Sequence, residues 1–125
     1  MYRTLLNAKI HRAVMTSADL NYEGSLTVDS TLLTAAGIRE FELVQVVDVE
    51  SGSRFETYTI SGPADSGIIQ ANGAAARLVQ AGDHVIIMSY VQVEEPLPEA
   101  WAPRIVLVDE KNRIREVRHG GHGAI

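Results

Sequence analysis

The sequence contains no cysteine, which excludes disulfide bonds and every reaction that depends on a thiolate. It has no run of about 20 apolar residues, the length that a membrane-spanning helix needs, and residues 1–9 lack the apolar stretch of a signal peptide. It also has no run of five basic residues, and its net charge is -5. We therefore expect a cytoplasmic protein with no nucleic-acid and no membrane partner.

The composition that remains is that of an ordinary globular domain. Apolar residues make up 46% of the 125 residues and charged residues 22%. A chain of this length can bury a core of its own. We expect a single domain over residues 1–118, followed by a flexible tail over residues 119–125, which is rich in glycine and histidine.

Alternation of apolar and polar residues predicts a mainly β chain. The expected strands cover residues 5–17, 26–28, 42–49, 54–60, 85–93, 104–109 and 113–118. On the strand at 54–60, the even-numbered side chains, which include Arg54 and Tyr58, would share one face, and Thr57 would lie on the other. The last two strands would form a hairpin.

Two short helices interrupt the expected strands. Asp29 or Ser30 can cap the first, and Gly37 can end it. Asn72-Gly73 reads as a turn that leads into the second. Residues 33–50 and 78–94 share the order helix end, Ala-Gly, strand, which suggests a pseudo-two-fold barrel, although chance would give so short a match as readily.

The dipeptide Gly24-Ser25 is a candidate site of self-cleavage. A serine hydroxyl that lies against the preceding carbonyl can attack it and convert the amide to an ester. Elimination of the ester breaks the backbone, and hydrolysis of the resulting dehydroalanine leaves a pyruvoyl group at the new N-terminus. Glycine places no side chain in the path of the attack. Because Gly-Ser pairs are common, as at the expected turn Gly52-Ser53, the interpretation depends on the residues around the pair.

Several polar residues occur where a simple barrel would not need them. Lys9 and His11 alternate on the first strand, Arg54 and Tyr58 share a face, and Tyr22 lies three residues before Ser25. Backbone N–H groups at the start of a helix, here around residues 73–75, favour anions. Each residue also has an ordinary structural role: arginine as a solvated charge, tyrosine as a rim aromatic, histidine as a hydrogen-bonded structural residue.

Six segments together resemble a known family, the pyruvoyl-dependent aspartate 1-decarboxylases. The segments are Lys9-Ile-His11-Arg, Ala18-Asp-Leu-Asn-Tyr-Glu-Gly-Ser25, Arg54-Phe-Glu-Thr-Tyr58, Asn72-Gly-Ala-Ala-Ala76, Gly82-Asp83 with Val85-Ile-Ile87, and Trp101 with Pro103. They extend from residue 1 to about residue 108, and the tail after Val108 departs from the family pattern.

The resemblance implies a fold and an assembly. It implies a six-stranded double-psi β-barrel with short helices, assembled as a homotetramer with active sites at subunit boundaries. Some relatives need a helper protein for cleavage, and the sequence does not reveal whether this chain needs one.

The resemblance also implies the reaction. Ser25, freed from Gly24, would become the pyruvoyl group, with Thr57 holding the oxyanion of the cleavage step. The pyruvoyl ketone would form a Schiff base with L-aspartate, CO2 would leave, and Tyr58 would return a proton. Release of β-alanine would supply pantothenate biosynthesis. The cofactor is then the chain's own pyruvoyl group, with no metal and no pyridoxal phosphate.

The substrate-binding residues that the resemblance implies are Lys9, Arg54, Thr57, Asn72, Gly73, Ala74 and Ala75, with His11 and Tyr22 as possible contributors. The fork of Arg54 suits a carboxylate, and Lys9 adds positive charge. His119 and His122 lie in the glycine-rich tail without the framework that metal ligands need, so no metal site is expected.

Two other functions stay open at this point. One is a non-catalytic acidic β-barrel that binds a small carboxylate or a protein, with Gly24-Ser25 intact. The other is a pyruvoyl-dependent decarboxylase for a different amino acid.

Overall fold

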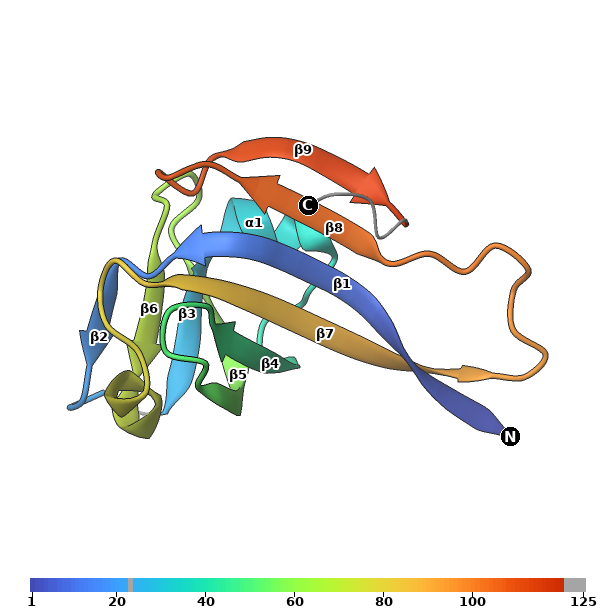
Figure 1. Cartoon of the computed structure of the whole chain (residues 1–125), viewed down its shortest axis with the longest axis horizontal. Helices are drawn as coiled ribbons and strands as arrows, with labels where there is room; N and C mark the ends of the chain where they lie inside the picture. The colour runs from blue at the N-terminus through green and yellow to red at the C-terminus, as the bar shows by residue number, and fades with distance from the viewer. Residues whose placement is uncertain (23, 121–125) are drawn as a thin grey trace.

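The computed structural model describes residues 1–22 and 24–120, and it confirms that the chain is mainly β (Figure 1). The strands form one nine-stranded sheet. Its elements, with the single α-helix and the 3₁₀ helix η1 of the described residues, are β1 (Tyr2–Val14), β2 (Ser17–Asp19), β3 (Ser25–Asp29), α1 (Ser30–Ala36), β4 (Leu43–Asp48), β5 (Arg54–Gly62), β6 (Ile69–Asn72), η1 (Gly73–Arg77), β7 (His84–Glu94), β8 (Arg104–Val108) and β9 (Ile114–His119).

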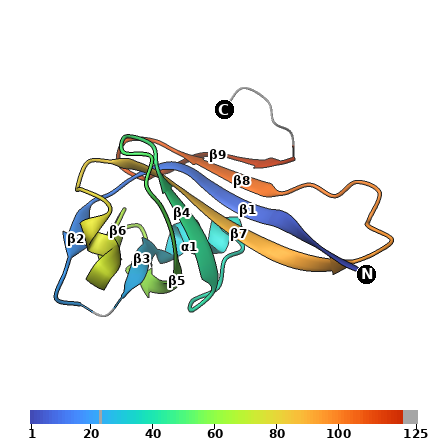
Figure 2. The same cartoon turned by 60° about the horizontal axis from the view of Figure 1, so that its bottom comes forward.

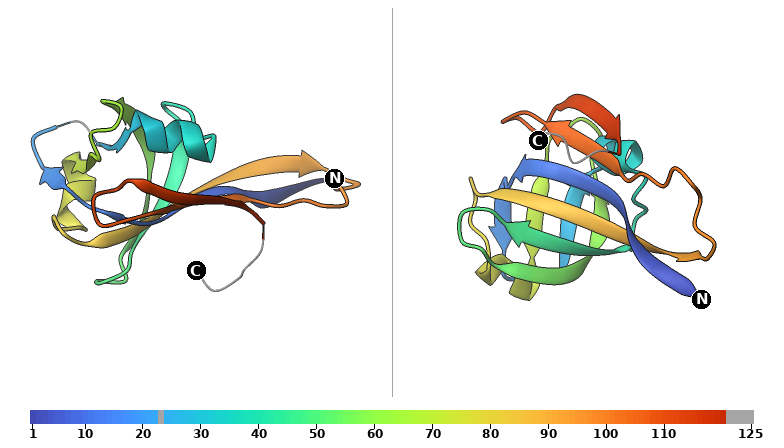
Figure 3. Two further views of the ribbon diagram at one scale, coloured as in Figure 1. Left: turned by 90° about the horizontal axis from the view of Figure 1, so that it is seen from above. Right: turned by 45° about the vertical axis from the view of Figure 1, so that its right-hand side comes forward.

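The strands follow the order β2-β6-β3-β5-β4-β7-β1-β8-β9. Neighbours are antiparallel except for β2 with β6, β3 with β5, and β1 with β8, which are parallel. The strong twist turns β2, β3 and β6 across β1, β7 and β4, so that the sheet folds over on itself (Figure 3). The core between the two groups includes Ile10, Leu26, Val46, Ile69 and Ile87, all fully buried.

The expected strand at 5–17 is wrong in its bounds, because the chain changes partners there. β1 ends at Val14, after a register shift against β7 between Ile10 and Ala13. The N–H of Met15 still bonds to the carbonyl of Asp83, but the N–H of Thr16 bonds to the carbonyl of Ile69. β2 then continues along β6. Alternation of side chains cannot reveal such a change of partner, since both parts remain extended.

Strand β6 was not expected from the sequence. Its four residues, Ile69–Asn72, are too few to show a period and include no aromatic residue. Burial of Ile69 and Ala71 and pairing on both sides, with β2 and β3, hold it in place. This strand matters for the site because it carries Asn72.

The first helix was predicted correctly, including both ends. Asp29 caps α1: its Oδ1 accepts the N–H of Thr31 (2.8 Å). Gly37 follows with φ of 72°, the left-handed conformation that glycine adopts readily. The second carboxylate oxygen of Asp29 accepts the N–H of Gly67 (2.8 Å) and so ties the loop before β6 to the helix.

At one end of the molecule β1 and β7 extend beyond the other strands as a twisted ribbon that ends at the N-terminus (Figure 2).

The expected hairpin is present and consists of β8 and β9, and β9 ends at His119. Residues 121–125 of the expected tail lie outside the described residues. The strands that close the two copies of the suggested repeat, β4 and β7, are antiparallel neighbours. No helix within the described parts of the chain is long and apolar enough to span a bilayer.

Candidate functional site

Ser25 lies at the start of β3 with its side chain enclosed. The residue is 1% exposed, and it pairs across the sheet with Asn72, which is 0% exposed. Nδ2 of Asn72 donates to Oγ of Ser25 (2.9 Å) and to Oγ1 of Thr27 (3.0 Å). A buried hydroxyl next to a carboxamide is shielded from water and held in one place, as a nucleophile must be.

The backbone before Ser25 lies directly against the start of η1. Gly73 has φ of 66°, and a Cβ at this position would come within 2.7 Å of N and Cα of Gly24 and within 2.9 Å of the carbonyl oxygen of Tyr22. Only glycine allows both this conformation and this approach. A Cβ on Gly24 itself would meet nothing within 4 Å. Gly73 therefore sets the position of residue 24, while Gly24 leaves its own surroundings open.

The small residues after Gly73 keep this part of the site accessible. Ala74 is exposed and Ala75 is half-buried, whereas Gly73 is buried. Tyr22 is 54% exposed. Glu23, which belongs to the same motif, lies outside the described residues. The structure thus brings Tyr22, Gly24, Ser25 and the segment 72–75 together at one end of the sheet.

Thr57 and Tyr58 approach the same place from β5. β5 runs parallel to β3 with Thr59 opposite Leu26, so that Tyr58 is level with Ser25 and Thr57 with Gly24. Both side chains are half-buried. The ring of Tyr58 packs against that of Phe41, with 6.5 Å between the centroids. The register therefore places the backbone of these two residues beside residues 24 and 25 of their own chain, with their side chains on opposite faces of β5.

Lys9 and Arg54 lie on other parts of the sheet than Ser25. Arg54 lies four residues before Tyr58 on β5, or about 13 Å along the strand. Lys9 is on β1, which is not a neighbour of β3 in the sheet order. The exposed Arg54 donates from Nη2 to Oε1 of Gln45 (3.1 Å). The predicted site residues therefore fall into one group around Ser25 and a second group that consists of Lys9 and Arg54.

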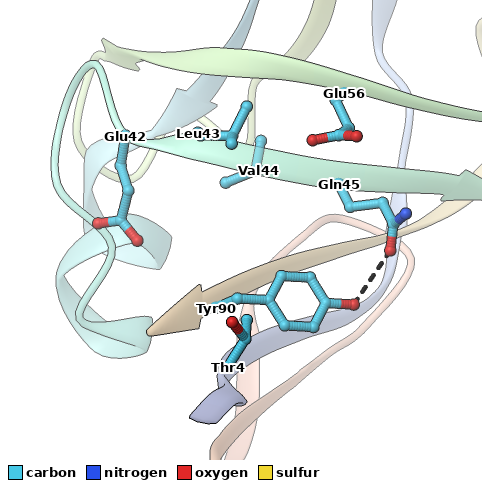
Figure 4. A pocket seen from close by; sticks show the side chains of 7 residues that line it. All are labelled: Thr4, Glu42, Leu43, Val44, Gln45, Glu56 and Tyr90. Carbon is cyan, nitrogen blue, oxygen red and sulfur yellow. Dashed lines mark hydrogen bonds between the residues drawn. The ribbon is translucent and has the colours of Figure 1, made fainter. Parts of the chain in front are cut away.

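An open groove of about 450 Å³ lies beside Arg54 on the outer face of β4 and β7 (Figure 4). The hydroxyl of Tyr90 donates there to Oε1 of Gln45 (3.0 Å), the oxygen that also accepts from Arg54. The lining includes the carboxylates of Glu42 and Glu56, which disfavour a ligand that is itself an anion. The groove taken alone is thus a poorer carboxylate site than its size suggests.

His11 lies apart from Ser25, in a cleft with Arg12, Leu107 and Glu110. Burial, together with the charges of Lys9 and Arg12, lowers the pKa of His11 below its usual value. Its imidazole is therefore neutral at pH 7.

Sequence reasoning missed a cluster of carboxylates between the β4–β5 turn and β7. One oxygen from each of Asp48, Glu50 and Asp83 lies within 4.8 Å of the other two. A hydrogen bond with Asp48 raises the pKa of Asp83 above its usual value. Burial raises the pKa of Asp48, but this hydrogen bond and the N–H groups of Ser51 and Glu50 together lower it more. The net shift of the Asp48 pKa is therefore downward. Nothing in the local sequence pattern indicates this cluster.

The expectation about His119 and His122 is not tested, because His122 lies outside the described residues.

His84, at the start of β7, contacts side chains from two loops. Glu50 belongs to the loop between β4 and β5, and Glu110 to the loop between β8 and β9. Its Nδ1 lies 3.0 Å from Oε1 of Glu50, and its Nε2 lies 3.2 Å from both carboxylate oxygens of Glu110. Hydrogen bonds with Glu110 and then with Glu50 raise the pKa of His84. Because the folded-state pKa is the higher one, this contribution to stability is complete below the usual histidine value and disappears as pH rises through the raised value.

We expect Glu110→Gln to lower the pKa of His84 in an NMR titration. The variant should also lose more thermal stability at about pH 6, where the imidazole is charged, than at about pH 8.5, where it is neutral. Glu99→Gln, in the exposed loop before β8, should change neither quantity. An equal loss of stability at both pH values would contradict the assigned ion pair.

The line of polar side chains that leads from Thr27 and Asn72 to Gln70 was also missed. Nε2 of Gln70 donates to Oδ1 of Asn72 (2.7 Å). The only signal in the sequence is that Gln70 and Asn72 are two residues apart, which places them on one face once the segment is known to be a strand.

The described residues thus combine a mainly β sheet with a buried serine that follows an unhindered glycine. The family model described as aspartate decarboxylase matches residues 1–115 of the chain. The chain belongs to the aspartate decarboxylase family.

Curated relatives are similar over nearly their whole length. The aspartate 1-decarboxylase of Neisseria meningitidis serogroup C is 61% identical over 117 residues, which cover 94% of this chain and 92% of the relative. The aspartate 1-decarboxylase of Carboxydothermus hydrogenoformans is 53% identical and that of Lactiplantibacillus plantarum 52%, covering 94% and 97% of this chain and 93% and 94% of the relatives. The family resemblance read from the six segments is thereby confirmed.

Proposed function

We propose that this chain decarboxylates L-aspartate to β-alanine with a pyruvoyl group made from its own Ser25. One observation supports the proposal most directly. In a chain of this family, the hydroxyl of Ser25 is buried and accepts a hydrogen bond from Asn72, and Gly73 packs against the adjacent backbone of Gly24. A buried, fixed hydroxyl next to an unhindered carbonyl is suited to attack that carbonyl.

The proposed self-cleavage proceeds in three balanced steps. Oγ of Ser25 attacks the carbonyl carbon of Gly24, the C–N bond breaks, and the hydroxyl proton passes to the nitrogen of residue 25, which gives an ester. Loss of the Cα proton of residue 25 breaks the Cβ–Oγ bond, and the electron pair leaves with the oxygen as the carboxylate of Gly24. Water then replaces the nitrogen of the dehydroalanine, ammonia leaves, and a ketone remains at the N-terminus of the longer fragment.

The residues around Ser25 fit such a group. The closely packed Gly73 and the small side chains at 74 and 75 leave space next to the backbone, which bulkier residues would fill. When formed, the pyruvoyl group supplies a ketone that accepts electrons from the carbon that loses CO2. Tyr58, level with Ser25 on β5, is the proton donor in this proposal, because a tyrosine hydroxyl is protonated at neutral pH. Thr57, level with Gly24, donates to the oxyanion of the cleavage step.

A second copy of the chain would supply Lys9 and Arg54 to the site. Within one chain Arg54 lies about 13 Å along β5 from Tyr58, and Lys9 is on a strand that does not neighbour β3. Both are on the outer face, next to the exposed Phe41, Leu43 and Tyr90, a surface that an adjacent subunit could cover. We propose a homotetramer with sites at its subunit boundaries, where the guanidinium of Arg54 binds one substrate carboxylate and Lys9 balances the charge.

We also propose the six-stranded double-psi barrel as the frame of each subunit. The parallel pairing of β3 with β5 and of β1 with β8, combined with antiparallel neighbours, is compatible with crossed connections of this kind. The sheet order as it stands is open, with β2 and β9 at its edges.

Mixing two inactive variants tests the shared site. We expect Ser25→Ala and Arg54→Ala to recover activity when they are coexpressed. A site is complete where the intact Ser25 of one chain meets the intact Arg54 of the other, which is about one quarter of sites (1/2 × 1/2) in random assemblies. Each variant expressed alone is the control. Activity no greater than the sum of the separate variants would place Arg54 and Ser25 of one site in the same chain.

Intact-mass measurement together with a substrate assay tests the proposed function. We expect a fragment that ends at Gly24, a larger fragment that begins with pyruvoyl, and production of CO2 from aspartate. A chain that remains uncut after prolonged warming would favour the binding module. Turnover of glutamate as well as aspartate would favour a decarboxylase with a different substrate.

Gly73→Ala should slow self-cleavage and lower stability, because its Cβ would collide with N and Cα of Gly24. The left-handed backbone alone costs about 1–3 kcal/mol. Gly52→Ala is a matched control: φ there is 77°, but a Cβ meets nothing within 4 Å. It should lose only the stability that the left-handed backbone costs, less than Gly73→Ala loses, and cleave at the normal rate. The two rates are read from the intact mass over time, and equal rates would remove the assigned role of Gly73.

A further inference from the structure

A line of polar side chains crosses β2, β6 and β3 and ends at Ser25. The hydroxyl of Ser17 donates to Oε1 of Gln70 (2.7 Å), and Nε2 of Gln70 donates to Oδ1 of Asn72 (2.7 Å). Nδ2 of Asn72 then donates to Oγ of Ser25 (2.9 Å). Ser17 pairs directly with Gln70, and Asn72 with Ser25. Strand pairing thus joins residues that are far apart in the sequence.

The inner end of this line is fully enclosed, while its outer end is half-buried. Asn72 and Ser25 are 0% and 1% exposed, and Ser17 and Gln70 are of intermediate exposure. Water cannot replace a missing partner at the inner end, so the protein itself must satisfy each polar group there. Asn72 meets this demand with Gln70 on its oxygen and with the hydroxyls of Ser25 and Thr27 on its nitrogen.

The two carboxamides of the line are turned the same way. Oε1 of Gln70 accepts the hydroxyl of Ser17, and the NH2 group of Gln70 therefore faces Asn72. An NH2 group only donates, so the oxygen of Asn72 faces Gln70 and its nitrogen faces Ser25 and Thr27.

The direction matters because Oγ of Ser25 gains negative charge in the elimination step of self-cleavage. There the electron pair of the Cβ–Oγ bond leaves with Oγ as part of the Gly24 carboxylate. An N–H aimed at Oγ stabilises this developing charge, whereas a carbonyl oxygen in the same place would repel it.

We infer that Gln70, aligned by Ser17, is a positioning residue for self-cleavage that keeps the N–H of Asn72 directed at Oγ of Ser25. The inference rests on the proposed self-processing function. It concerns two residues that are outside the segments that carry the family resemblance. Gln70 acts only through Asn72 and touches neither the 24–25 bond nor the substrate.

Gln70→Glu tests the inference with a side chain of nearly the same shape. The ionised carboxylate only accepts, so Asn72 must turn its NH2 group toward it and its oxygen toward Ser25. We expect self-cleavage at neutral pH to slow by about 10²-fold, the scale for losing one oxyanion donor. In acid the new carboxyl is protonated, its O–H can donate to Oδ1 of Asn72, and the rate should recover toward that of the unmodified chain. The measurement is the intact mass of freshly purified precursor over time, between about pH 4 and pH 8.

Two further variants separate position from charge and from folding. Gln92→Glu makes the same change at an exposed position of β7 and should cleave normally at every pH. Gln70→Met removes the donor without adding charge and should cleave slowly at every pH, with no recovery in acid. The charged groups on elements that pack against β6, namely Asp19 on β2, Asp29 on β3 and Arg77 on η1, are the same in all of these chains.

The acid recovery is the result that a merely structural role would not produce. Slowing of Gln70→Glu by the same factor at all pH values, or cleavage at the normal rate at neutral pH, would overturn the inference. If Gln70→Glu does not fold, as judged by its thermal melt, normal cleavage by a folded Gln70→Met would overturn it equally. An unmodified chain that is never cut would instead refute the proposed function.

Discussion

Ser25→Ala leaves the chain whole and without decarboxylase activity. Alanine has no oxygen to attack the Gly24 carbonyl, so no ester forms and no ketone appears. Asn72 keeps Thr27 and Gln70 as partners, and the new methyl group replaces a side chain that is already buried, so the fold should persist. Turnover should fall by at least about 10⁴-fold, the scale for losing a group on which the whole mechanism depends.

Ser53→Ala is the matched control for this experiment. Ser53 also follows a glycine, but it lies in the turn before β5, where its carbonyl accepts the N–H of Asp48 (2.9 Å). We expect this variant to cleave at 24–25 and to turn over aspartate normally. Intact mass and a denaturing gel report cleavage, and CO2 release reports activity. Two fragments from Ser25→Ala would show that another group cuts the chain.

Tyr58→Phe should leave cleavage largely intact and lower turnover by about 10²-fold or more, the usual scale for losing a general acid. The ring remains, so its packing against Phe41 is preserved and only the hydroxyl is lost. The carbon that loses CO2 would then have to take its proton from water. Cleavage should be measured first, because it shows whether the variant enters the assay in processed form.

Tyr2→Phe is the corresponding control. The hydroxyl of Tyr2 donates to Glu94 (3.2 Å) near the exposed end of the β1–β7 ribbon, and its loss should alter neither cleavage nor turnover. An unprocessed Tyr58→Phe chain would assign the hydroxyl to maturation. Normal turnover by processed Tyr58→Phe would exclude it as the proton donor.

Local sequence signals predicted much of the fold. Alternation predicted β4, β5 and β7 closely, and Asp29 and Gly37 fixed the ends of α1. These features depend on neighbours in the chain: a cap bonds two residues away, and a strand shows its faces in its own period. The same locality explains the failures, since β6 and the break between β1 and β2 depend on partners about 50 residues away.

The candidate site divides in the same way. The sequence named Gly24, Ser25, Asn72 and Tyr58, and the strand register brings these residues to one end of the sheet. It named Lys9 and Arg54 as well, but Lys9 lies on a strand that does not neighbour β3, and Arg54 lies four residues before Tyr58 on β5. A motif records which residues a family uses, and it contains no information on which copy of the chain supplies them.

By itself, the sequence determined the family, the mainly β character and the serine on which the proposed chemistry depends, because these are written in residue identity and short-range spacing. Only the tertiary structure decided that Gly73 receives the backbone of Gly24 and that Gln70 directs Asn72 toward Ser25. Such contacts come from strand pairing and the exclusion of water, which bring together groups that the sequence keeps apart.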